Sequence, residues 1–183
     1  MTSDLSTPDA CVESAGEITF VERTVDHPDA AHLLDAFYKE QFGRYGFAES
    51  VDLEHDDYAV PNGIFIVAYR RDLPVGCGGY RWYDRKTATV EIKKTYLLPV
   101  ARGRGVGHAL LRFLESTAIK SGARRAILET GVRNTAALSL FISSGYEPTA
   151  RYVSGRDPLI NRAFAKALAS SPRLHGRAAQ ATA

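Results

Sequence analysis

The residues from Arg102 to Gly107 have the composition of a turn that binds an anion. They follow a run of strand-type residues and open a run with helical periodicity, which places the turn at a helix N-terminus. There the first N–H groups have no intrahelical partner, and the helix dipole adds partial positive charge. Arg102 and Arg104 add full charges, and glycine at 103, 105 and 107 lets a bulky phosphate approach the backbone. The chemistry that this stretch predicts is phosphate binding.

Known phosphate-binding motifs narrow the choice of ligand. A nucleoside-triphosphate loop needs GxxxxGK followed by Ser or Thr, and no lysine follows these glycines. A dinucleotide fingerprint needs GxGxxG, and its third glycine would fall at His108. The pattern that remains is Arg-x-x-Gly-x-Gly, formed by Arg102, Gly105 and Gly107. An ordinary glycine-rich connection between a strand and a helix stays open as the alternative.

The bulk composition describes one globular domain. The chain has 183 residues, 45% of them hydrophobic and 24% charged, which is enough apolar material for a core. A net charge of +2 is too small to favour nucleic acid or an anionic membrane as a partner. Cys11 and Cys77 make no disulfide framework, and no apolar run approaches the ~18 residues of a membrane helix. Because no secretory signal follows Met1, we expect a cytoplasmic protein.

Hydrophobic periodicity divides the chain into alternating strands and helices. We expect a flexible leader over residues 1–16, a single domain over 17–169 and a disordered tail over 170–183. The predicted strands are 18–25, 64–69, 75–83, 90–98, 124–130, 146–153 and 159–168. Three helices are predicted. The first follows an N-cap at Asp26 and ends at Gly43–Gly46, the second runs from 105 to Gly122, and the third runs from 134 to 144. This order predicts an α/β fold in which one mixed sheet has helices on both faces.

Two irregularities mark the predicted central strands. In VEIKKTYLL the alternation of apolar and polar residues slips at Lys93–Lys94, as a β-bulge would produce. In VGCGGYRWY the glycines at 76, 78 and 79 weaken the strand, so we expect another part of the chain to approach that backbone closely. The sequence shows no base near Cys77 that would generate a thiolate, so we assign this residue to the core.

The acidic stretch from Glu49 to Asp57 (ESVDLEHDD) has two interpretations. It is either a solvated surface segment or a lip whose negative potential attracts a cationic substrate. His55 with Asp56 and Asp57 could hold a metal ion only with a second cluster of ligands, and the sequence offers none, so we predict no metal.

Several segments in order resemble the GNAT (Gcn5-related) acyl-CoA N-acyltransferases. They are VEIKKTYLLP, ARGRGVGHALL and LETGVRNTAALSLFISSGY, and the resemblance covers residues 18–168. The stretch from Gly63 to Gly131 is also similar to a bacterial subgroup of small-molecule acetyltransferases. The resemblance implies a central mixed sheet of about six to seven strands and acetyl-CoA as co-substrate.

The resemblance also implies a set of cofactor contacts. Leu97 and Leu98 would offer main-chain hydrogen bonds to the pantetheine arm, and Asn134 matches an asparagine that often contacts that arm. The residues whose N–H groups would hold the pyrophosphate are Arg102, Gly103, Arg104, Gly105, Val106, Gly107 and His108. Phe141 lies where many members have a tyrosine that protonates the departing thiolate.

Direct attack of an amine on the acetyl thioester is the chemistry that the resemblance implies. Glu91 matches the position of a frequent glutamate base, while an ion pair of this residue with Lys93 or a nearby arginine is the alternative role. Since Phe141 has no proton to give, Tyr152 and then Tyr146 are the candidates for the acid. No acid is needed if water protonates a thiolate whose conjugate thiol has a pKa near 8.5.

The leading functional hypothesis is an N-acetyltransferase acting on a small-molecule amine. Acetylation of a protein N-terminus or lysine is the second hypothesis, and a catalytically silent acyl-CoA-binding module is the third. Phe141 favours the silent module and Glu91 argues against it. A homodimer is compatible with the sequence, and neither a nucleic acid nor a membrane is expected as a partner.

Overall fold

The computed structural model describes residues 18–47, 55–155 and 157–168. The predicted leader and tail, and the acidic residues before His55, lie outside these ranges. Within them, seven strands form one mixed sheet in the order β1-β2-β3-β4-β5-β7-β6. Their bounds are β1 Ile18–Glu22, β2 Gly63–Arg70, β3 Leu73–Asp84, β4 Thr89–Leu97, β5 Arg125–Gly131, β6 Glu147–Pro148 and β7 Asn161–Ala167. Only β4 and β5 pair in parallel among these strands, which confirms the predicted α/β class and mixed sheet.

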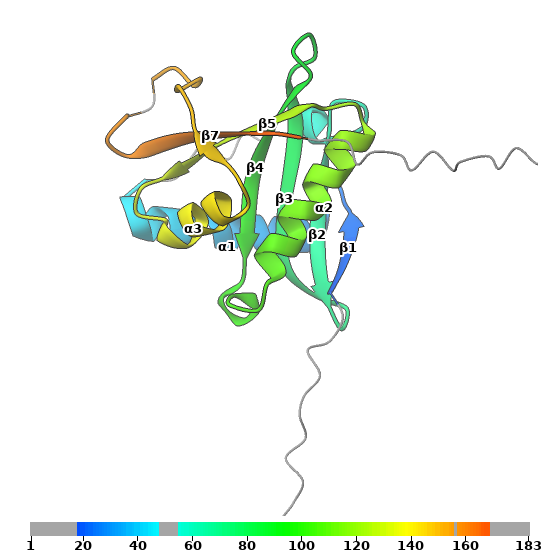
Figure 1. The fold of residues 1–183 in the computed structure, drawn as a ribbon. Helices are drawn as coiled ribbons and strands as arrows, with labels where there is room; N and C mark the ends of the chain where they lie inside the picture. Colours follow the sequence, from blue (N-terminus) through cyan, green and yellow to red (C-terminus); the bar gives the residue numbers. More distant parts are fainter. Residues whose placement is uncertain (1–17, 48–54, 156, 169–183) are drawn as a thin grey trace, which may run out of the picture.

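Helices cover both faces of the sheet, as predicted. In Figure 1, α1 (Pro28–Tyr45) lies behind the sheet, and α2 (Val106–Lys120) and α3 (Thr135–Ser143) lie in front of it. Two short 3-10 turns, η1 (His55–Tyr58) and η2 (Pro99–Ala101), complete the described helical elements. One core forms under α2 and α3, and a second forms under α1 around Leu33, Leu34 and Tyr38. No helix in the described ranges is long and apolar enough to cross a membrane.

The start and end of α1 differ slightly from the prediction. The N-cap is His27, one residue after Asp26, because Pro28 occupies the first helical position and its missing N–H costs nothing there. Gly43 stays inside the helix, and only Gly46, in the left-handed conformation with φ 78°, ends it. The helix therefore continues far enough to include Arg44, which pairs with Glu40 at 2.6 Å.

The predicted β-bulge is present in β4. The register with β3 passes from Gly79↔Lys93 to Cys77↔Tyr96, so the bulged strand has one residue more than its partner. Lys94 takes a φ of 57°, and its ammonium lies over the rings of Phe37 and Tyr38 on α1. Because a bulge bends its strand, β4 changes direction between Lys93 and Tyr96.

The glycines of β3 do permit a close backbone approach. A Cβ at Gly76 would lie 2.8 Å from the Tyr96 carbonyl oxygen, and one at Gly79 would lie 2.6 Å from that of Ile64. Cys77 between them is fully buried, its thiol faces the Lys94 carbonyl at 3.6 Å, and burial raises its pKa. It is a core residue, as predicted.

The closing strands are shorter than predicted. Instead of 146–153 and 159–168, the chain forms β6 over two residues and β7 over seven. Pro148 has no N–H to continue a ladder, and the described residues from Thr149 to Ile160 form a connection that crosses the sheet edge. Tyr152 therefore lies on a loop, not on a strand.

Candidate active site

A cleft opens where β4 and β5 separate. The two strands share only the pairs Thr89↔Arg125, Val90↔Ala126 and Glu91↔Ile127, after which the bulge turns β4 away while β5 keeps its full pairing with β7. The cleft has a volume of about 410 Å³ and is also bordered by α1, α3 and the loop before β7. Its lining includes Glu40, Arg44, Tyr45, Glu91, Ile92, Lys93, Lys94, Leu128, Glu129, Asn134, Phe141, Asp157 and Ile160. A ligand arm can therefore reach main-chain groups of β4 that the neighbouring strand leaves unpaired.

The glycine-rich turn is shaped to accept an anion. Gly103 and Gly105 have φ angles of 72° and 77°, and a Cβ on either would meet no atom within 4 Å, so the space beside the turn is open. Gly105 is the N-cap of α2 and offers no side chain to its N–H groups. The turn therefore fits a pyrophosphate at the backbone of Gly103–His108. Arg102 is the exception within the predicted set, because its N–H donates to the Pro99 carbonyl at 3.2 Å.

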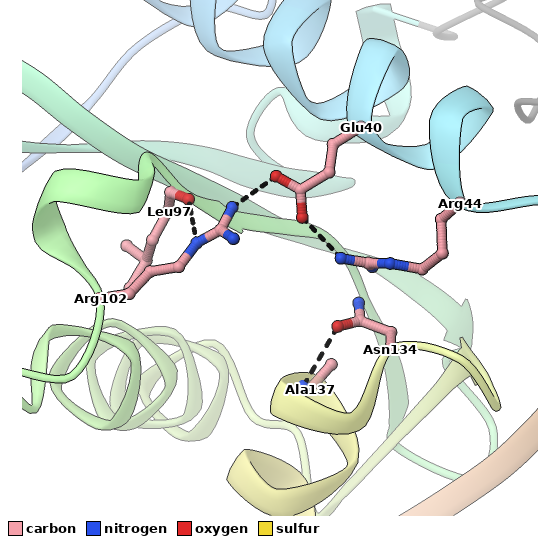
Figure 2. A network of polar contacts seen from close by, with 6 residues as sticks. All are labelled: Glu40, Arg44, Leu97, Arg102, Asn134 and Ala137. Carbon is pink, nitrogen blue, oxygen red and sulfur yellow. Dashed lines mark hydrogen bonds and ion pairs between the residues drawn. The ribbon is translucent and has the colours of Figure 1, made fainter.

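The side chain of Arg102 is directed toward α1. Figure 2 shows its Nε donating to the Leu97 carbonyl at 2.9 Å and its terminal nitrogen contacting Glu40 at 2.6 Å. The other oxygen of Glu40 accepts from Arg44 at 2.6 Å. This ion-pair network connects Arg102, at the start of the glycine-rich turn (the anion turn), to Glu40 and Arg44, which line the cleft from α1. Arg102 thus fixes the end of β4 besides adding charge near the turn.

The main chain at the end of β4 restricts how Leu98 could contact a ligand. The N–H of Leu98 donates to the Val75 carbonyl at 2.9 Å, and its carbonyl accepts from Ala101 at 2.9 Å. Both groups therefore have partners within the protein. The N–H of Leu98 is not available to donate to the pantetheine arm. The carbonyls of Leu97 and Leu98 can each accept a second hydrogen bond besides the one that they already accept, so both remain candidates as acceptors.

Titration of Glu40 gives a test of the network. Burial acts to raise the pKa of this carboxyl, but the hydrogen bond and charge of Arg102, with the charge of Arg44, outweigh burial and lower it from 4.5. A carboxyl whose folded-state pKa is depressed stabilises the fold above its unfolded pKa, and the contribution is lost as pH falls through the folded value. We expect urea denaturation to show wild type more stable than Glu40→Gln at pH 7, with the difference shrinking below pH 4.5.

A matched control for this titration lies on the same helix. Asp35 pairs with Lys39 at 2.7 Å, but both side chains are more than half exposed, and exposed pairs contribute little to stability. Asp35→Asn should therefore show a much smaller dependence on pH. A Glu40→Gln difference that is the same at pH 7 and pH 4 would mean that the network does not stabilise the turn.

Glu91 lines the cleft, and both of its carboxylate oxygens have partners. Its side chain is only 3% exposed, and Arg81 Nε lies 3.0 Å from Oε2. Lys93 Nζ is 3.5 Å from Oε1, to which the Tyr152 hydroxyl donates at 3.1 Å. The ion pairs with Lys93 and an arginine are therefore present, and Tyr152 is close enough to exchange a proton with the carboxylate.

Comparison with known proteins identifies the family that carries this arrangement. The sequence model of the acetyltransferase (GNAT) family matches residues 28–146, which include the turn, the bulged strand and Glu91. This chain belongs to the GNAT acetyltransferases.

Relatives agree with this GNAT assignment. The chain is 34% identical over 110 residues to the IAA acetyltransferase of Azospirillum brasilense, covering 58% of this chain and 70% of that protein. A GNAT-family acetyltransferase structure from Staphylococcus aureus superimposes with a TM-score of 0.69 at 19% identity, covering 84% and 100% of the two chains. A GNAT acetyltransferase from Elizabethkingia anophelis with acetyl-CoA bound gives a TM-score of 0.61 at 20% identity, covering 82% and 98%. The two structures show the shared GNAT fold.

The two tyrosines predicted as acid differ in their surroundings in this GNAT domain. Tyr152 contacts Glu91 and packs edge-on against Tyr83, with ring centroids 5.3 Å apart. Tyr146 is 2% exposed, packs against Phe141 and does not line the cleft. Burial and the neighbouring Glu115 raise the pKa of Tyr146. The structure brings Tyr152 to Glu91 and leaves Tyr146 in the core.

The remaining residues predicted from the GNAT resemblance line the cleft or lie on the first turn of α2. Asn134 and Phe141 line the cleft, and Asn134 also caps α3 by accepting from the Ala137 N–H at 3.3 Å. His108, on the first turn of α2, has its Nε2 2.9 Å from the Ser143 hydroxyl, so its side chain connects α2 to α3. Its main-chain N–H stays part of the anion turn.

Several residues around the cleft were not predicted from the sequence. Glu40 and Arg44 on α1 had no signal, because their partner Arg102 is far away in the sequence. Arg81 could have been found from strand alternation, since it lies directly opposite Glu91 in the β3–β4 register. Asp57, the last residue of the acidic stretch, contacts Arg81, so its carboxylate is not simply a solvated surface charge.

Proposed function

We propose that this GNAT enzyme transfers an acetyl group from acetyl-CoA to a primary amine, most simply that of a small molecule, by direct attack in a ternary complex. The observation that carries the proposal is Glu91, which lines the cleft and accepts a hydrogen bond from Tyr152 at 3.1 Å. The ion pair of Arg102 with Glu40 joins the anion turn to a residue that lines the same cleft. A phosphate-bearing ligand held at the turn would extend its arm along β4 toward Glu91 and Tyr152. An acceptor amine would then meet the arm beside Glu91.

The residues present fit the phosphate and arm of coenzyme A. The N–H groups of Gly103–His108 would hold the pyrophosphate, and the open space beside Gly103 and Gly105 leaves room for it. Leu97 and Asn134 would orient the arm, and the apolar side chains of Ile92, Leu128 and Phe141 would surround its end. When bound, acetyl-CoA supplies an activated acyl group as a thioester.

The acceptor needs a base before it can attack. An alkylamine with a pKa near 10.4 is almost fully protonated at pH 7, which corresponds to roughly 4–5 kcal/mol of deprotonation. Glu91 would take this proton directly or through a water molecule, and the amine nitrogen would then bond to the acetyl carbon. Arg81 Nε and Lys93 Nζ lie 3.0 and 3.5 Å from the two oxygens of this carboxylate.

The C–S bond breaks as the amide forms, and the departing thiolate must gain a proton. Phe141 has none to give, so Tyr152 or water would supply it. Tyr152 is favoured over Tyr146 because its hydroxyl lies at Glu91, which can return the amine's proton to it. Over a full cycle the ammonium form of the amine loses two protons: the thiolate gains one of them, and the other is released to solvent.

Release of free thiol from acetyl-CoA across a panel of amines tests the proposal. The panel contains amino acids, polyamines, aminoglycosides and short peptides, and mass spectrometry identifies the acetylated product. We expect release that depends on a small amine and yields its N-acetyl derivative. Turnover only on peptides would replace small molecules with protein or peptide acceptors. Tight acetyl-CoA binding in calorimetry without turnover on any amine would contradict the enzymatic proposal and favour a silent binding module.

A further inference from the structure

We propose that Arg81 and Asp57 form a positioning pair that holds Glu91 for proton transfer, an inference that rests on the function proposed above. Four separate segments contribute to this cluster: Asp57 from η1, Arg81 from β3, Glu91 from β4 and Tyr152 from the loop after β6. These four residues are far apart in the sequence, yet they form one continuous series of polar contacts.

Arg81 contacts a carboxylate on each side. Its Nε lies 3.0 Å from Glu91 Oε2, and one of its terminal nitrogens contacts Asp57 Oδ2. The guanidinium fork is planar and rigid, so two anchored carboxylates fix its orientation. Because Arg81 also lies opposite Glu91 in the strand register, the backbone and the side chains hold the same alignment. Glu91 is thereby held with Oε1 facing Tyr152.

Asp57 also offsets charge around Glu91. Arg81 from β3 and Lys93 from β4 both contact Glu91, so two cations lie beside one carboxylate. The other charged side chains that line the cleft are Glu40 and Arg44 from α1, Lys94 from β4, Glu129 from β5 and Asp157 from the loop before β7. Although burial opposes its charge, contacts with Asp57 and Glu91 raise the pKa of Arg81, so the guanidinium stays charged. The carboxylate of Asp57 contacts this guanidinium and offsets part of its positive charge.

The pair therefore predicts opposite effects of two substitutions. Arg81→Met removes a positive neighbour of Glu91, so the carboxylate should hold a proton more tightly. The acidic limb of the plot of kcat against pH then moves to higher pH by about one unit. Asp57→Asn removes a negative charge, so the same limb moves to lower pH. We also expect Arg81→Met to lower kcat about tenfold through lost orientation, with the KM for acetyl-CoA unchanged. Arg81→Lys should recover part of kcat.

The profiles are measured as kcat at saturating acetyl-CoA and one saturating amine, so the titration of the amine is common to all variants. Arg85→Met is the matched control. Arg85 lies just beyond the same strand, over the Trp82 ring at 4.9 Å, and contacts the Pro61 carbonyl outside the cleft. It should keep the wild-type profile. Thermal melting of each variant separates loss of fold from loss of positioning.

Each experimental outcome tests either the positioning pair or the proposed acetyltransferase function. Shifts in opposite directions for Arg81→Met and Asp57→Asn would support the positioning pair. Shifts in the same direction, or unchanged limbs with lower melting temperatures, would overturn it while the acetyltransferase function stands. Absence of amine-dependent turnover by wild type would overturn the proposed function, and the inference with it.

Discussion

Glu91→Gln is expected to lower kcat for amine acetylation by about 100-fold or more, because the amide cannot accept the amine's proton. The change keeps the size and the shape of a side chain that is only 3% exposed, so the cleft itself should persist. Acetyl-CoA affinity should change little in calorimetry, since Glu91 is not part of the anion turn at Gly103–His108. Thiol release with the best amine of the panel measures kcat.

A second buried glutamate provides the control for this substitution. Glu115 on α2 is 8% exposed and accepts hydrogen bonds from Lys166 at 2.8 and 2.9 Å, so it loses a similar ion pair when changed to glutamine. Because Glu115 does not line the cleft, Glu115→Gln should reduce stability but leave kcat near wild type. If Glu91→Gln turned over as fast as Glu115→Gln, Glu91 would be a structural ion-pair residue and another group would be the base.

Gly79→Ala is expected to lower the free energy of unfolding by about 3 kcal/mol or more, in the upper range for overpacking a core. The new methyl would lie 2.6 Å from the Ile64 carbonyl oxygen and 2.9 Å from the Tyr58 ring. A main-chain carbonyl in a central ladder cannot move without breaking strand pairing. Urea denaturation followed by circular dichroism measures the loss, and insoluble expression would count as the same result.

The neighbouring glycine is the control for Gly79→Ala. A methyl at Gly78 would contact the flexible end of Leu114 at 3.2 Å and Thr95 at 3.5 Å. Those contacts can relax by a few tenths of an ångström, so Gly78→Ala should cost much less. Equal losses for the two variants would show that the intrinsic preference of the strand, rather than backbone approach from β2, decides which residue fits.

Local patterns in the sequence predicted the parts of the site that depend on neighbours in the chain. The turn at Arg102–Gly107 follows from glycine and arginine spacing, and the slip at Lys93–Lys94 gave the bulge. The strand predicted over 146–153 was wrong because its tendency to be extended finds a partner only at Glu147 and Pro148. Tertiary pairing, not residue type, decided the length of that strand.

Contacts between distant segments could not be predicted in the same way. Tyr152 meets Glu91 across 61 positions, and Glu40 meets Arg102 across 62. Nothing in the residues around Glu40 distinguishes it from other acidic residues on the exposed side of a helix. The resemblance to GNAT enzymes predicted the roles of Glu91 and the anion turn. It carried no information about Arg81, Asp57 or the ion-pair network of α1.

The brief pairing of β4 with β5 has a mechanical consequence. The sheet consists of two halves, β1–β4 and β5–β7–β6, whose direct ladder is limited to three residue pairs at one end. We expect those pairs to act as a hinge, so that a small rotation about them would widen the opposite end while the longer ladders stay intact. A long, thin ligand could then enter and leave as the two halves move apart. In hydrogen exchange, the amides of the three-pair ladder between β4 and β5 should exchange well before those that β2 and β3 share.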